Sequence, residues 1–378
     1  MKLFKKVDSN NMKQEIEDQG LSIELTIKNE LENIKNISKK LQKCERFVFS
    51  GCGDKYVVPL ASKYLWNHIS EKPLDVIQSW TLKNYPPKHL NSKTCVVFVS
   101  QSGTTYDTVD ACKLAIEKKC KVVALTNLKE EKYDSLVELC ENYKNGHVIR
   151  THTKSYPEKS LPSTGSFHAS LTALNLFTIF VNKGPQKFID FQVNYIPKVV
   201  DSLSNSELVK KWAQKAAKKL KKFNNFYVVG DGPRYPVARK QARIMMMEAT
   251  KVNACDIEGE EFVHSLIETL ESKSNPLILL KPLMGWEDSF RNFEMVKKFW
   301  LEHAGKKKLT IINPFKFLDK KINYLFSGID GDILSAFLYA PQLEWLSYYL
   351  ALERGFDPSV GKLVKKVRNR TQIKKMLT

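Results

Sequence analysis

Thr94-Cys95-Val96-Val97-Phe98-Val99-Ser100-Gln101-Ser102-Gly103-Thr104-Thr105 is the stretch that decides the fold class of this chain. Its apolar, β-branched first half predicts a buried strand, and apolar residues at helical spacing begin again at Val109. The loop between them offers backbone N–H groups, the positive end of a helix dipole and hydroxyl donors, which together suit phosphate binding. An ordinary Ser/Thr helix cap is the alternative, but a cap accounts for only one of these hydroxyls.

The chain repeats this kind of unit. Residues 47–56 have the same pattern as residues 226–235, and both predict a strand, a G-x-G turn and a helix. Two further strand patterns recur, which pair 95–99 with 276–280 and 121–125 with 308–312. Buried strands that alternate with helices predict parallel sheets covered on both faces. We therefore predict an α/β protein with two tandem domains, each a flavodoxin-like three-layer sandwich.

The predicted organisation has four parts. A helical lead-in spans residues 1–42, the first α/β domain 43–200, the second 201–355, and a basic tail 356–378. The apolar stretch near 171–181 is too short to cross a bilayer, and the N-terminus lacks the apolar region of a signal peptide. We therefore expect no membrane segment.

Composition narrows the class of protein. Seven cysteines without a C-x-x-C pair, among them Cys95, Cys112 and Cys255, are interpreted as core residues of a reduced, cytoplasmic protein. The net charge is +19, but only nine basic residues are arginine, and the lysine runs have helical apolar spacing. This pattern indicates solvated helix faces and argues against nucleic acid as a partner, although the charge attracts anionic small molecules.

Two segments of the second half carry candidate catalytic groups. Residues 239–248 have helical spacing, and Glu248 lies beside a methionine-rich stretch, where a half-buried carboxylate would suit proton transfer. A surface glutamate is the alternative. Residues 256–265 place four acids near His264, which fits either a catalytic or a structural histidine and is weak evidence for a metal. Both turns follow the pattern G-x-G-x-x-Y, with tyrosine where the dinucleotide-binding pattern G-x-G-x-x-G has its third glycine. No nucleotide cofactor is therefore expected.

Together these motifs resemble the sugar isomerase (SIS) domain family, which includes the isomerase half of glucosamine-6-phosphate synthase. Cys52-Gly53 resembles the family's Cys-Gly turn, residues 100–105 its phosphate loop, and Pro162-Ser163-Thr164 its Ala-Ser-Thr segment. The resemblance implies a substrate-binding set of Cys52, Gly53, Lys55, Ser100, Gln101, Ser102, Thr105 and Ser163. Within this set, Lys55 replaces a serine of the family and would supply charge to the bound sugar phosphate.

The resemblance also implies the catalytic groups. Glu248 would move a proton between C1 and C2 of the sugar. His264, contributed by the neighbouring subunit of a homodimer, would open the ring, and Lys365 in the C-terminal tail would close over the sugar. No metal or cofactor is implied, and one site per chain is expected, because the second copy has Lys281-Pro282-Leu283-Met284-Gly285 where the first has hydroxyls.

The implied function is an isomerase or deaminase of sugar phosphates. The first candidate reaction converts glucosamine 6-phosphate to fructose 6-phosphate and ammonia through an enolamine. A fructosamine-6-phosphate deglycase, another hexose-phosphate isomerase and a non-catalytic phosphosugar sensor are the alternatives.

Overall fold

The computed structural model describes residues 9–129, 132–272, 275–282 and 287–363. The chain forms two compact units, which we describe separately. One consists mainly of Leu21–Glu158 and Gly165–Pro197, and the other mainly of Lys198–Val360 with Lys159–Thr164 and the residues up to Gly20. The predicted domain boundaries stay predictions. No helix in the described part of the chain is both long and apolar enough to cross a membrane.

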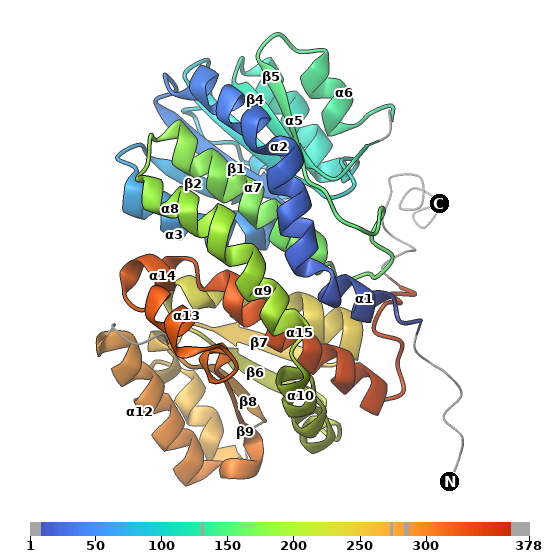
Figure 1. Ribbon diagram of the computed structural model, residues 1–378, viewed down its shortest axis with the longest axis vertical. Helices are drawn as coiled ribbons and strands as arrows, with labels where there is room; N and C mark the ends of the chain where they lie inside the picture. The colour runs from blue at the N-terminus through green and yellow to red at the C-terminus, as the bar shows by residue number, and fades with distance from the viewer. Residues whose placement is uncertain (1–8, 130–131, 273–274, 283–286, 364–378) are drawn as a thin grey trace. The chain divides into compact units, whose positions relative to one another are not determined.

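The first unit contains a parallel sheet with the strand order β2-β1-β3-β4-β5 (Figure 1). Its strands are β1 (Arg46–Gly51), β2 (Leu74–Gln78), β3 (Thr94–Val99), β4 (Lys121–Thr126) and β5 (Gly146–Arg150). Strand β3 is the apolar run predicted from the sequence, and every one of its residues is buried. The strand order is that of flavodoxin-like folds, and it reverses between β1 and β3.

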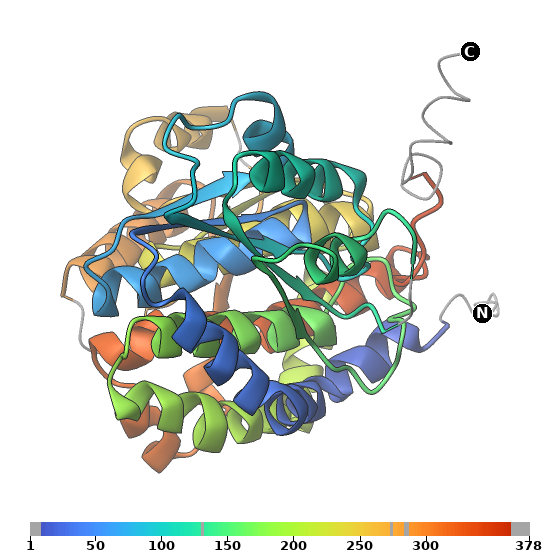
Figure 2. The same ribbon diagram turned by 90° about the horizontal axis from the view of Figure 1, so that it is seen from above.

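Helices cover both faces of the first sheet. The helices that carry this packing are α3 (Asp54–Ile69), α4 (Ser79–Asn84), α5 (Tyr106–Glu117), α6 (Leu136–Glu141) and α7 (Gly165–Val181). Helices α3 and α7 lie side by side (Figures 1 and 2), and Phe47 of β1 packs on Trp66 of α3 at 4.7 Å and Phe177 of α7 at 6.4 Å between ring centroids. The next residue along β1, Val48, belongs to a core cluster with residues of α4, α5 and α6. The alternation of side chains along the strand thus produces the three layers.

The second unit contains a smaller parallel sheet with the order β7-β6-β8-β9, which matches the order β2-β1-β3-β4 of the first. Its strands are β6 (Asn225–Val229), β7 (Asn253–Ile257), β8 (Leu277–Leu280) and β9 (Leu309–Ile312). Helix α12 (Glu287–His303) packs on one face through Phe293, Val296 and Trp300. The helices of the other face are α10 (Glu207–Leu220), α11 (Tyr235–Lys240), the π-helix η3 (Gln241–Thr250) and α15 (Ala336–Glu353).

Five of the seven cysteines are buried as predicted, and Cys52 is half-buried. Cys95 and Cys112 are buried in the first unit, whereas Cys255 is exposed. The core prediction for Cys255 is wrong because β7 is an edge strand whose side chains alternate between buried and exposed, and Cys255 lies on the exposed side.

Candidate functional site

The hydroxyl-rich loop, residues 100–105, follows the carboxyl end of β3 at the point where the strand order of the first sheet reverses. Ligands of open parallel sheets bind at such switch points. The Ser100 hydroxyl lies 3.0 Å from the Thr105 hydroxyl. Thr105 precedes α5 but makes no side-chain cap hydrogen bond. Because its hydroxyl turns to Ser100, the simple helix-cap interpretation does not account for it.

The turn after β1 reaches the same edge of the sheet. Gly51 pairs with Val99 in the strand register, so Cys52 and Ser100 begin neighbouring loops. The Cys52 thiol sulfur lies 3.5 Å from the hydroxyl oxygen of Thr108 in α5. This contact joins the turn after β1 to the first turn of α5.

A buried ammonium group lies in the same turn. Lys55, in the first turn of α3, is only 6 % exposed. Its Nζ donates to the hydroxyl of Ser166 in α7 at 3.1 Å and lies 3.3 Å from a carboxylate oxygen of Asp54. The ammonium is therefore partly neutralised while it is held at the carboxyl edge of the sheet.

Glu158 and Ser166 join this cluster, although the sequence did not single them out. One Glu158 oxygen accepts from the side-chain amide of Gln101 at 3.0 Å, and the other accepts from the backbone N–H of Ser166 at 2.8 Å. A lone acid in an aperiodic loop gives no pattern signal, whereas Ser166, two residues after Thr164, could have been found as a hydroxyl near a helix start. The edge of the first sheet thus carries seven of the predicted substrate-binding residues, namely Cys52, Gly53, Lys55, Ser100, Gln101, Ser102 and Thr105.

The eighth predicted binding residue, Ser163, is buried in the segment Lys159–Thr164, which packs within the second unit. Two backbone N–H groups of this segment donate to the Glu15 carboxylate at 2.6 and 3.2 Å. A third donates to the backbone oxygen of Ser359 at 3.0 Å. The Ser163 carbonyl accepts from the ammonium of Lys240 at 2.8 Å. The segment is therefore held along its length by side-chain and backbone partners.

Glu248 lies on η3 and is half-buried, whereas Met245 and Met246 on the same π-helix are buried. The predicted helix over 239–248 is realised as α11 followed by this π-helix. Runs of π-helix are rare and recur at functional sites, because the wider turn rearranges which side chains align.

His264 lies in the loop after β7, with 61 % of its side chain exposed. Its Nε2 is 2.9 Å from a carboxylate oxygen of Glu260, and this hydrogen bond raises the pKa of His264. The imidazole therefore stays protonated to higher pH than an ordinary histidine. Its contribution to a neighbouring subunit stays a prediction, and Lys365 lies outside the described residues.

The acids near His264 differ in their surroundings. Asp256 accepts from the Tyr235 hydroxyl at 2.9 Å and pairs with Arg239 at 3.4 Å, so its role is structural. Burial raises the pKa of Glu258 in the same loop. Among the described residues, no three His, Cys, Asp or Glu side chains are grouped so as to hold a metal ion.

The fold and the loop at its switch point define a flavodoxin-like α/β protein with a candidate phosphate site. Residues 40–180 match the family model described as SIS domain. The match covers the first sheet and its hydroxyl loop. Because it does not extend to the second sheet, a second SIS domain stays a prediction.

The names of several proteins that resemble this chain in sequence or fold refer to sugar phosphates. The chain is 24 % identical over 360 residues to a glutamine–fructose-6-phosphate aminotransferase (isomerizing) of Methanothermobacter thermautotrophicus, an alignment of 94 % of this chain and 56 % of that protein. The chain thus spans about half the length of this relative.

Two solved structures share the fold. The C-terminal domain of glucosamine-fructose-6-phosphate aminotransferase from Francisella tularensis superposes with a TM-score of 0.76 at 18 % identity, over 93 % of this chain and 98 % of that one. Glucosamine-6-phosphate deaminase from Thermotoga maritima superposes with a TM-score of 0.68 at 17 % identity, over 92 % and 96 %. At these identities the likeness establishes the fold alone.

Proposed function

We propose that the protein is a sugar-phosphate isomerase of the deaminating kind, which converts glucosamine 6-phosphate to fructose 6-phosphate and ammonia. The observation that carries this proposal is the hydroxyl-rich loop 100–105 at the switch point, with the buried Lys55 ammonium on the neighbouring turn. Hydroxyl donors, the N-terminus of α5 and a fixed positive charge match the oxygens and the charge of a phosphate. The names of the similar proteins agree with a phosphorylated sugar as ligand.

The candidate catalytic groups fit the steps of this reaction. In the proposed mechanism, His264 donates a proton to the ring oxygen during ring opening, which its raised pKa favours. Glu248 then takes the proton from C2 and returns it to C1. The C1 oxygen gains a proton and the amine nitrogen loses one, so that C1 becomes a hydroxymethyl carbon and an imine forms at C2. Water adds to this imine and ammonia leaves, so that fructose 6-phosphate remains.

Incubation of the purified protein with glucosamine 6-phosphate tests the reaction. We expect ammonia and fructose 6-phosphate in equal amounts. Turnover of fructosamine 6-phosphate or of a hexose phosphate alone would instead assign one of the alternative enzyme activities. Binding without turnover of any of these compounds would indicate a phosphosugar sensor, and the absence of both would reject the proposal.

Lys55→Met tests the phosphate site itself. Because a hydrogen bond to a charged group is worth about 1.5–3 kcal/mol, we expect the Kd of glucosamine 6-phosphate to rise roughly 10- to 100-fold. Lys83→Met is the matched control, since Lys83 lies in the same unit and pairs with Asp110 at 2.7 Å. Calorimetry measures both affinities, and an equal effect of the two variants would contradict a role of Lys55 at the site.

A further inference from the structure

The ammonium group of Lys240 is buried in the second unit. Lys240 is 1 % exposed. Its Nζ lies 3.1 Å from a carboxylate oxygen of Glu344, 2.8 Å from the backbone oxygen of Ser163 and 3.4 Å from the sulfur of Met245. Glu344 balances the charge, and the Ser163 carbonyl is a stronger neutral acceptor than the Met245 thioether.

Glu344 is itself fixed in place. It is 1 % exposed and its second oxygen accepts a hydrogen bond from the side-chain amide of Gln19. The amide oxygen of Gln19 in turn accepts from the Ser204 hydroxyl at 3.0 Å. This chain of buried hydrogen bonds leaves the Glu344 carboxylate little freedom to turn away from Lys240.

Stability alone is a weak reason for this ion pair. Desolvation of two charges offsets most of their attraction, so apolar residues of similar size often serve a core equally well. The pair does, however, direct a charged donor at the backbone oxygen of Ser163. That oxygen belongs to the residue that we assign to the sugar-phosphate site.

We propose that Lys240, held by Glu344, is a positioning residue that fixes the Ser163 peptide for the bound phosphosugar. Glu15 and Ser359 hold the beginning of the segment, and Lys240 holds the end that carries Ser163. Lys240 acts through Ser163 and makes no contact with the sugar. This inference rests on the proposed function, because it assumes that Ser163 meets the ligand.

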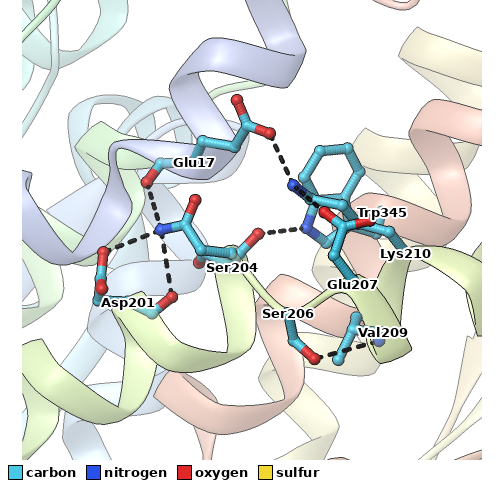
Figure 3. Close-up of polar contacts among 9 residues, drawn as sticks. Glu17, Asp201, Ser204, Ser206, Glu207, Val209, Lys210 and Trp345 are labelled. Carbon is cyan, nitrogen blue, oxygen red and sulfur yellow. Dashed lines mark hydrogen bonds and ion pairs between the residues drawn. The ribbon is translucent and has the colours of Figure 1, made fainter.

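Lys210 offers a matched control in the same unit (Figure 3). Its ammonium lies 2.8 Å from Glu17 and 3.2 Å from Glu207, and it lies 5.1 Å from the centre of the Trp345 ring. It therefore links several elements through charge, as Lys240 does. Its described contacts all lie outside residues 159–164.

The test compares the double variant Lys240→Met/Glu344→Gln with Lys210→Met. The double variant removes both buried charges at once and keeps an oxygen for Gln19, so it is designed to fold. We measure hydrogen exchange of residues 159–164 and the Kd of glucosamine 6-phosphate by calorimetry. We expect at least 10-fold faster exchange in this segment and at least 10-fold weaker binding in the double variant, with both quantities unchanged in Lys210→Met.

The outcomes separate the inference from the proposed function. Failure of the unaltered protein to bind glucosamine 6-phosphate rejects the proposed function, whatever the exchange data show. If the unaltered protein binds, unchanged exchange or unchanged affinity in the double variant overturns the role of Lys240. Equal effects of Lys210→Met also overturn it, because they would reflect general destabilisation. A thermal unfolding curve of each variant establishes that it is folded.

Discussion

At the scale of single residues, buried charges are the least expected feature of this protein. Lys55, Lys240 and Glu344 are each 6 % exposed or less, and each has partners of opposite charge or strong acceptors. Loss of one member of such a pair leaves the other charged in an apolar surrounding, whereas loss of both does not. The effect on stability of replacing one of these residues is therefore expected to depend mainly on whether its partner is replaced as well.

Lys240→Met alone should be more harmful than its combination with Glu344→Gln. The single change strands the Glu344 carboxylate, so we expect the free energy of unfolding to fall by about 3–5 kcal/mol. The double variant should recover most of this loss. Urea unfolding of the three proteins measures the difference, and equal stabilities of the single and double variants would contradict the pairing.

The Glu260–His264 pair leads to a pH-dependent prediction. Glu260→Gln removes the hydrogen bond that raises the pKa of His264, so the pKa should fall towards the ordinary value of about 6.5. Because the folded-state pKa is raised, the pair contributes its full stabilisation below pH ~6.5 and loses it as pH rises through the folded-state pKa. NMR titration of the imidazole measures the pKa, and an unchanged value in Glu260→Gln would refute the assignment.

At the scale of elements, the turn between β1 and α3 combines a close backbone approach with a left-handed backbone conformation. A Cβ on Gly51 would lie 2.3 Å from the backbone oxygen of Lys55 and 3.0 Å from that of Val99. Gly53, two residues later, has φ 55°, and a Cβ added there would meet no atom within 4 Å. The same turn therefore needs glycine for two different reasons.

Gly51→Ala and Gly53→Ala should separate these reasons. In Gly53→Ala, the only cost is that alanine must adopt a left-handed backbone conformation. We expect the free energy of unfolding to fall by about 1–2 kcal/mol. Gly51→Ala must displace the first turn of α3, so a larger loss, about 3 kcal/mol or more, is expected. Chemical denaturation of both variants checks the order, and a smaller loss for Gly51→Ala would show that the turn relaxes easily.

At the scale of the whole molecule, the net charge of +19 attracts anions from solution. Such a field speeds association with phosphorylated ligands and is screened by salt. Raising the ionic strength from about 0.05 to about 0.5 M should therefore slow association of glucosamine 6-phosphate several-fold. Stopped-flow kinetics measures the association rate, with the dissociation rate as internal control. A rate that is independent of salt would show that the charge lies away from the route to the site.

The sequence by itself predicted strands β1, β3, β4, β6, β8 and β9, their alternation with helices, and the hydroxyl loop, because periodicity and turn chemistry are local properties. Strands β2, β5 and β7 were identified only in the structure. The strands at 94–99 and 121–126 follow their apolar runs. Only the tertiary structure revealed Glu158, Ser166 and Lys240, whose partners are distant in sequence. The tertiary structure also showed that Cys255 is exposed on an edge strand. Burial and pairing depend on which segments meet, and no local pattern of residues records that.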